Sequence, residues 1–127
     1  MHGAFPALDR DVLDALCGGD AAFLAELQGL FQEQLEEFIP LGETAGVRGA
    51  DFAQRAQFLA HRLRGSAGAL GFRRLAQGLA ELERSAKAAL ETGGGFQELA
   101  TPVQACVADC LSAREALAQY AQSLAER

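Results

Sequence analysis

Apolar and polar residues along this chain follow the period of an α-helix. Apolar positions recur three and four residues apart in five segments, and glycine or proline interrupts the pattern between the segments. The first helix is expected from Pro6 or Asp9 to Gly18-Gly19, and the second from Asp20 to Pro40 or about Ala45, followed by a turn over 46–49. The third is expected from Asp51 to about Ala69, and the fourth from Phe72 to about Leu90. The last is expected to end at Leu124 and to begin either at Thr101 or at an earlier turn over Phe96–Ala100. Each segment has one apolar stripe and the connections are short. We therefore expect an all-α fold, an antiparallel four-helix bundle with a short additional N-terminal helix.

Polar residues at the expected helix starts indicate how the helices are capped. Asp20 and Asp51 stand directly before apolar runs, where a carboxylate can accept hydrogen bonds from the first free backbone N–H groups. Thr101 and Gln104 have the spacing of a capping box, with a proline at the first helical position. These residues are expected to act as N-terminal caps.

Length and composition support a single helical domain. A chain of 127 residues is expected to form one domain over 1–127. Half of its residues are hydrophobic, which argues against disorder. β-Branched residues are scarce while alanine and leucine are abundant, and this composition favours helices over strands.

Charge and cysteine content narrow the partners and the compartment. The formal net charge is −6, which argues against nucleic acid as a partner. No stretch approaches the roughly 20 apolar residues of a membrane span, and no secretory signal is visible at the N-terminus. The three cysteines are too few and odd in number for a disulfide scaffold, so a reducing cytoplasm is expected. Nothing in the sequence requires a homodimer, and we expect a monomer.

The helix expected over 51–69 carries a histidine on the side opposite its apolar stripe. At about 100° per residue, one sector of this helix collects the apolar residues. That sector holds Phe52, Ala56, Leu59, Leu63, Ala67 and Leu70, and the outer face around His61 holds Gln54, Gln57, Phe58, Arg64, Gly65 and Gly68. His61 is therefore expected to face solvent.

Two glycines and a cation accompany this histidine. A glycine within a helix costs roughly 1 kcal/mol relative to alanine, and Gly65 and Gly68 follow His61 at four and seven residues, on the same stripe. Their missing side chains leave the imidazole uncovered and allow a partner's backbone to approach. Arg64, three residues after His61, is placed to hold phosphate oxygens.

Positive charge concentrates around the histidine. The segment 48–74 has a net charge of +5 in a chain whose total is −6. It contains one acid, Asp51, and six arginines: Arg48, Arg55, Arg62, Arg64, Arg73 and Arg74. Such a local field suits an anionic group on His61, or an acidic partner that docks beside it.

These features fit phosphoryl transfer through an imidazole. Imidazole has an ordinary pKa of about 6.5, so one ring nitrogen is available at neutral pH to attack a phosphoryl group while an acceptor holds the other. The chain has no GxxxxGK[ST] loop for ATP. The phosphoryl group is therefore expected to arrive from another protein and to leave to another protein, and positioning and electrostatics supply the catalysis.

The run HRLRGSAGALG from His61 to Gly71 resembles the signature of the histidine-containing phosphotransfer (HPt) family, His-x-Leu-Lys-Gly-Ser-(Ala/Ser)-x-x-Leu-Gly. The resemblance extends over the five-helix plan and implies a phosphocarrier, not an enzyme with its own ATP site. It implies that His61 receives phosphate from, or donates it to, the aspartate of a response-regulator receiver domain, in a phosphorelay with a sensor or hybrid histidine kinase. Arg64 stands where the family has lysine, and would steady the phosphate.

The resemblance also suggests further site residues. Glu83 occupies the position from which some members of the family reach the imidazole, so it would hold the Nδ1 proton or remain a solvated acid. Residues around the histidine would bind the partner: Gln57, Phe58, Arg62, Gly65 and Gly68. No cofactor is expected on this chain, and any magnesium would belong to the aspartate pocket of the receiver.

Several alternatives are weighed against this interpretation. In the dimerisation-and-phosphotransfer part of a histidine kinase an acidic residue typically follows the histidine, whereas Arg62 follows it here. A plain helical adaptor with an incidental histidine would take up no phosphate. Phe58 is either core filler at the boundary or a hydrophobic partner contact. Cys106 and Cys110 have a spacing that can join metal ligands, but buried small side chains are the favoured interpretation.

Overall fold

The fold described here is that of a computed structural model, which describes residues 6–44 and 49–126. Within these residues the chain forms five α-helices, two short 3-10 helices and no strand, which confirms the predicted all-α class. The elements are α1 (Arg10–Cys17), α2 (Ala21–Phe38), η2 (Ile39–Gly42), α3 (Ala50–Leu70), α4 (Arg73–Thr92), η3 (Phe96–Leu99) and α5 (Ala100–Ala125). No described helix is both long and apolar enough to cross a membrane.

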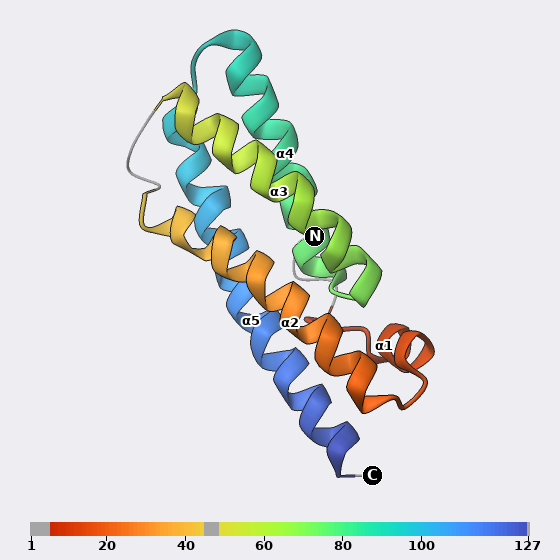
Figure 1. Cartoon of the computed structure of the whole chain (residues 1–127). Helices are drawn as coiled ribbons and strands as arrows, with labels where there is room; N and C mark the ends of the chain where they lie inside the picture. Colours follow the sequence, from red (N-terminus) through yellow and green to blue (C-terminus); the bar gives the residue numbers. More distant parts are fainter. Residues whose placement is uncertain (1–5, 45–48, 127) are drawn as a thin grey trace.

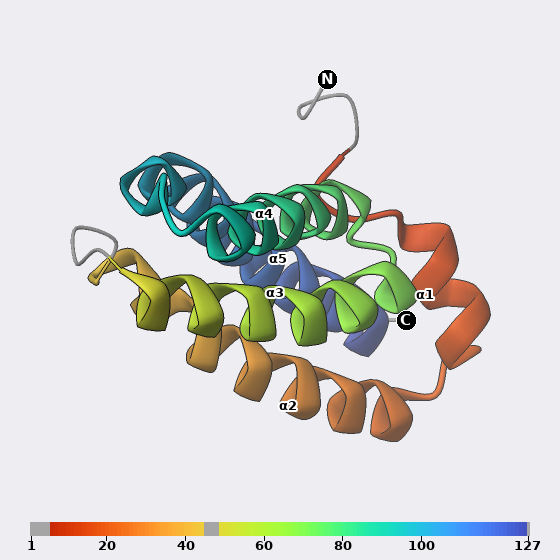
Figure 2. The ribbon, with the colours of Figure 1, turned by 90° about the horizontal axis from the view of Figure 1, so that it is seen from above.

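The four long helices form a bundle, and α1 lies at one end of it. Helix α3 packs on α2 and, most extensively, on α4, while α5 packs on α2 and α4 from the other side (Figure 1). Seen from above, α1 lies across the end of the bundle at which α3 ends and α4 begins (Figure 2). The middle of α3 is thereby left without a covering helix on its outer side.

The predicted apolar face of α3 is the face that enters the core. All six residues of that face are at most 8% exposed, which confirms the helical-wheel prediction. Ala53 and Ala60 are also fully buried, so the buried arc is wider than the apolar stripe alone predicted. Small side chains at these positions allow the backbones of α3 and α4 to approach closely.

One of the three predicted caps is present, and two are wrong. Asp20 caps α2 by accepting a hydrogen bond from the backbone N–H of Phe23, at 3.1 Å. Asp51 does not cap α3: the N-cap is Gly49, and Asp51 lies in the first helical turn. There its negative charge faces the positive end of the helix dipole, which stabilises the helix without a capping hydrogen bond.

The starts and ends of two helices also differ from the prediction. Helix α2 ends at Phe38 and continues as the 3-10 turn η2, because Pro40 cannot donate the hydrogen bond of a longer helix. The capping box at Thr101 is wrong: η3 leads directly into α5 at Ala100, so the earlier turn is the true start. The turn expected over 46–49 lies outside the described residues except for its last position.

Helix α1 is fixed to the bundle by one contact at its N-cap and one near its middle. The Asp9 backbone N–H donates to the Gly71 carbonyl at 2.8 Å, and the buried Tyr120 hydroxyl donates to Asp14 Oδ1 at 2.6 Å. Gly71 has φ +94°, and a Cβ added there would lie 2.8 Å from the Asp9 carbonyl oxygen. Only glycine therefore fits this junction between α3 and α4.

Candidate functional site

His61 lies in the middle of α3 with its side chain 64% exposed. Its Nδ1 is 2.9 Å from Oε2 of Glu83, which comes from the facing side of α4 and is 21% exposed. The structure thus brings Glu83 to the imidazole, at the position that the family resemblance suggested.

This contact selects one form of the imidazole ring. A carboxylate only accepts hydrogen bonds, so the 2.9 Å contact is satisfied when Nδ1 carries the proton and donates it to Glu83. The neutral ring then has its lone pair on Nε2. Within the described part of the chain no hydrogen bond to Nε2 is found, so this nitrogen is free to act as a nucleophile.

Arg64 lies beside His61 on the outer side of α3, as the helical wheel predicted, and it also contacts Glu83. Its Nε lies 2.9 Å from Glu83 Oε1, and one of its terminal nitrogens lies 3.3 Å from His61 Nδ1. The first contact is an ion pair, although the N–H is not aligned for a hydrogen bond. The second contact is not a hydrogen bond, because a protonated Nδ1 cannot accept one from Arg64. It places the positive charge of the guanidinium beside the imidazole ring. The guanidinium of Arg64 is therefore held between Glu83 and the imidazole ring.

The surface around the histidine is shallow and partly apolar. A hollow of about 300 Å³ is lined by Gln54, Gln57, Phe58, His61 and Glu83. Phe58 is 55% exposed, so of its two interpretations the structure excludes core filler. An exposed aromatic ring beside the imidazole is suited to contact with another protein.

The two glycines of α3 differ in their surroundings. A Cβ at Gly65 would meet nothing within 4 Å, so its missing side chain leaves open space over the outer face. A Cβ at Gly68 would lie 3.9 Å from Cβ of Ala76 in α4, an ordinary contact. Gly65 therefore opens the surface beside His61, whereas Gly68 lies at the edge facing α4.

The predicted cluster of arginines is not one free positive face. Arg62 pairs with Glu37 of α2 at 3.0 Å, and its guanidinium lies 5.8 Å from the centroid of the Phe58 ring. Two other arginines have partners outside α3: Arg73 with Asp9 at 3.8 Å and Arg74 with Asp109 at 3.3 Å. Arg55 is exposed, and Arg48 lies outside the described residues. The folded chain therefore offsets much of the local charge that the sequence window indicated.

Sequence reasoning missed two cations that the fold brings to the site. Arg84 and Lys87 lie on the exposed side of α4, where they line a hollow of about 190 Å³ together with Arg64, Ala80 and Glu83. The four-residue spacing of Lys87 from Glu83 was a usable signal, because residues four apart share a helix face. Arg84, which directly follows Glu83, had no such signal.

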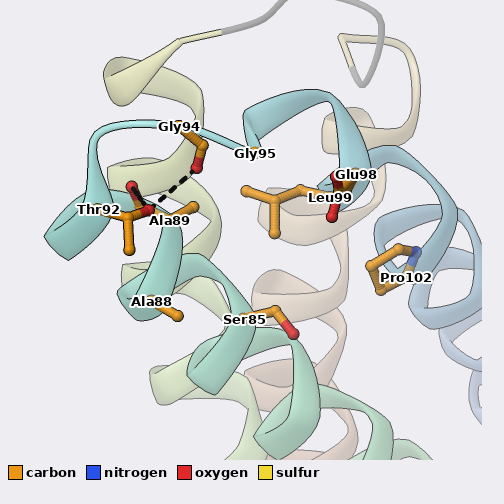
Figure 3. A pocket seen from close by; sticks show the side chains of 9 residues that line it. All are labelled: Ser85, Ala88, Ala89, Thr92, Gly94, Gly95, Glu98, Leu99 and Pro102. Atoms are coloured by element: carbon orange, nitrogen blue, oxygen red, sulfur yellow. Dashed lines mark hydrogen bonds between the residues drawn. The ribbon is translucent and has the colours of Figure 1, made fainter.

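Neither the cysteines nor the largest hollows near α4 add a second site. Cys106 and Cys110 are buried, and burial raises the pKa of Cys106 to about 12. Among the residues that the structure describes, no group of three or more His, Cys, Asp or Glu is arranged to hold a metal ion. A hollow of about 440 Å³ between the end of α4 and the start of α5 has Glu98 as its one charged lining residue (Figure 3). It shares no lining residue with the hollow at His61.

Comparison with known proteins identifies the family of this chain. The family model of the Hpt domain matches residues 21–126, from the start of α2 to the end of α5. No significant match is found among curated proteins or among solved structures. The family match covers α3 and α4, which carry His61, Arg64 and Glu83, and it leaves out α1. The chain therefore belongs to the Hpt domain family of helical phosphocarrier modules, which serve histidine phosphotransfer in two-component signalling.

Proposed function

We propose that His61 is the phosphoryl-accepting residue of this chain, and that it exchanges the phosphoryl group with the aspartate of response-regulator receiver domains. The observation that carries this proposal is the 2.9 Å contact of an exposed imidazole with Glu83, which leaves the Nε2 lone pair available. A sensor or hybrid histidine kinase would supply the group at the head of the relay.

The transfer needs few groups from this chain. The Nε2 lone pair forms a bond to phosphorus as the bond between phosphorus and the receiver's aspartate oxygen breaks, so the aspartate leaves as a carboxylate. The ring gains positive charge, and Glu83 stabilises it through the Nδ1–H bond. Arg64 places a guanidinium beside the ring, where it adds positive charge for the incoming phosphoryl oxygens. Any magnesium is expected in the aspartate pocket of the partner.

The remaining expectations belong to the same proposal. We infer that residues 1–127 form one domain, a monomeric cytoplasmic protein in which α2 to α5 make an antiparallel four-helix bundle with α1 added. The contacts of α3 with α2 and α4, and of α5 with the same two helices, support this arrangement. Gln57, Phe58, Arg62, Gly65 and Gly68 would contact the partner.

The decisive experiment is incubation with a receiver domain carrying a radiolabelled phosphoryl group. The native chain should acquire a label that is lost in acid and stable in base, as expected for a phosphoramidate. The chain has two histidines, so His61→Gln should abolish labelling while His2→Gln leaves it unchanged. A native chain that stays unlabelled by every receiver tested would favour the adaptor interpretation instead.

A further inference from the structure

The two flanks of the His61 site differ in charge. On the α4 flank, Arg84 and Lys87 join Arg64 around a hollow of about 190 Å³, directly beside the hollow that holds His61. Glu83 lines both hollows, so the two form one continuous surface across α3 and α4. The α4 flank therefore adds two cations, beside Arg64 of α3, to the edge of the proposed phosphotransfer site.

Arg84 and Lys87 are available for a partner. Over the described ranges, neither takes part in an ion pair or a side-chain hydrogen bond, and both are exposed. Glu83, which lines the same hollow, is already engaged by His61 Nδ1 and by Arg64 Nε. By contrast, Arg62 on the other side of His61 is held by Glu37. The unused positive charge of the site thus lies on the α4 side.

The α2 flank has the opposite character. Every charged residue of α2 is a glutamate: Glu26, Glu33, Glu36 and Glu37. Because Glu37 offsets the charge of Arg62, a partner that covers His61 meets less positive charge along the α2 edge than along the α4 edge. Such a gradient attracts a complementary surface in one orientation and disfavours the reverse orientation.

From this gradient we infer that Arg84 and Lys87, with Arg64, form a docking site for an acidic patch on the rim of the receiver domain. This inference rests on the proposed function. It adds the residues of this chain that select and orient the receiver domain. The occupant is a protein surface and not a free anion, because the hollow is small and open and two of its three cations are exposed. In that setting charge complementarity chiefly raises the association rate and fixes the orientation.

The test is the binding kinetics of a receiver domain with the full chain, at low and high salt. Arg84→Glu and Lys87→Glu should each reduce the association rate by about tenfold at low salt, since a like charge then faces the acidic patch. The difference should shrink at high salt, where the screening length falls to a few ångströms. Arg114→Glu is the matched control, because it makes the same charge change at an exposed position of α5, and it should stay within about twofold of native.

The outcomes separate this inference from the proposed function, because binding is measured independently of labelling. Equal effects of Arg84→Glu and Arg114→Glu, or effects that persist at high salt, would overturn the docking site even when the native chain is labelled. Competition by inorganic phosphate at millimolar concentration would instead indicate a small-anion site, and would also overturn it. A native chain that binds through Arg84 yet takes no label would sustain the docking site and contradict the phosphotransfer role.

Discussion

Glu83 Oε2 lies 2.9 Å from His61 Nδ1, so a residue of α4 fixes the tautomer of the α3 imidazole. Replacing Glu83 with alanine removes the acceptor for Nδ1–H, and both neutral tautomers should then be populated. We expect transfer to slow roughly threefold to tenfold, which corresponds to about 1 kcal/mol for a positioning hydrogen bond. Glu83→Gln retains an acceptor oxygen and should be less impaired.

Nitrogen chemical shifts of the imidazole provide the matching measurement for this variant. They should show mainly the Nδ1–H tautomer in the native chain and a mixture in Glu83→Ala. A variant with native shifts and native transfer would show that Glu83 is only a solvated acid near the ring.

Gly65 offers a way to separate docking from folding. A Cβ at Gly65 meets nothing within 4 Å, and the same is true of Gly29 in α2, so Gly65→Ala and Gly29→Ala should each stabilise the fold by about 0.5–1 kcal/mol. Thermal unfolding should show this as a rise of a few degrees. The larger change Gly65→Leu should slow transfer without unfolding the bundle, because its bulk lies where the partner docks.

Gly29→Leu is the control for bulk alone, and it should leave transfer unchanged. Native transfer rates in a folded Gly65→Leu variant would contradict the assignment of this face to the partner.

Arg64 and Arg74 should differ in what their loss impairs. Arg64 contacts both Glu83 and the imidazole, so Arg64→Ala should slow transfer or shorten the lifetime of phosphohistidine. Arg74 pairs with Asp109 of α5 at 3.3 Å, away from His61, so Arg74→Ala should reduce the free energy of unfolding by about 1 kcal/mol and spare the transfer rate. Rapid-quench labelling measures the transfer rate of each variant, and urea unfolding measures its stability. Equal loss of transfer in the two variants would mean that the arginines contribute only to the overall positive potential around His61.

The buried thiol of Cys106 makes stability depend on alkaline pH. Burial raises the pKa of this thiol from 9.0 to about 12, with Asp109 and Glu81 adding to the shift. The unfolded chain loses the proton near pH 9 and the folded chain retains it, so the free energy of unfolding should fall as pH rises from 9 towards 12. Cys106→Ala should reduce this dependence in urea titrations at pH 8 and pH 10, and the buried Cys110 thiol, whose pKa burial also raises, should account for part of what remains. An unchanged slope would show that the thiol is not the group responsible.

The position of His61 could be predicted from the sequence because it depends on one helix alone. The helical period places Phe52, Leu59 and Leu63 in the core, and the opposite direction then follows for the histidine. The caps at Asp51 and Thr101 could not be predicted equally well. The 3-10 turn η3 continues directly into α5, and such a continuation has no distinct polar signal at the junction.

The charge of the site was the least predictable feature, because it depends on contacts between helices. The acids that pair with the arginines of segment 48–74 come from elsewhere in the chain: Asp9, Glu37, Glu83 and Asp109. Counting charges within one window cannot include them. The same effect concealed Arg84 and Lys87, which reach the site only after α4 has packed on α3.

The attachment of α1 has a consequence for how such a chain can evolve. Its anchors at Gly71 and Tyr120 lie at one end of the bundle, and Gly71 is ten residues, or roughly 15 Å of helix, beyond His61. Family members without a counterpart of α1 can therefore retain the histidine and its surroundings, in keeping with a family match that begins at residue 21. Substitutions that adapt this end of the molecule to a hotter or colder habitat need not compromise signalling, so the trade-off that often couples robustness to activity is relaxed here.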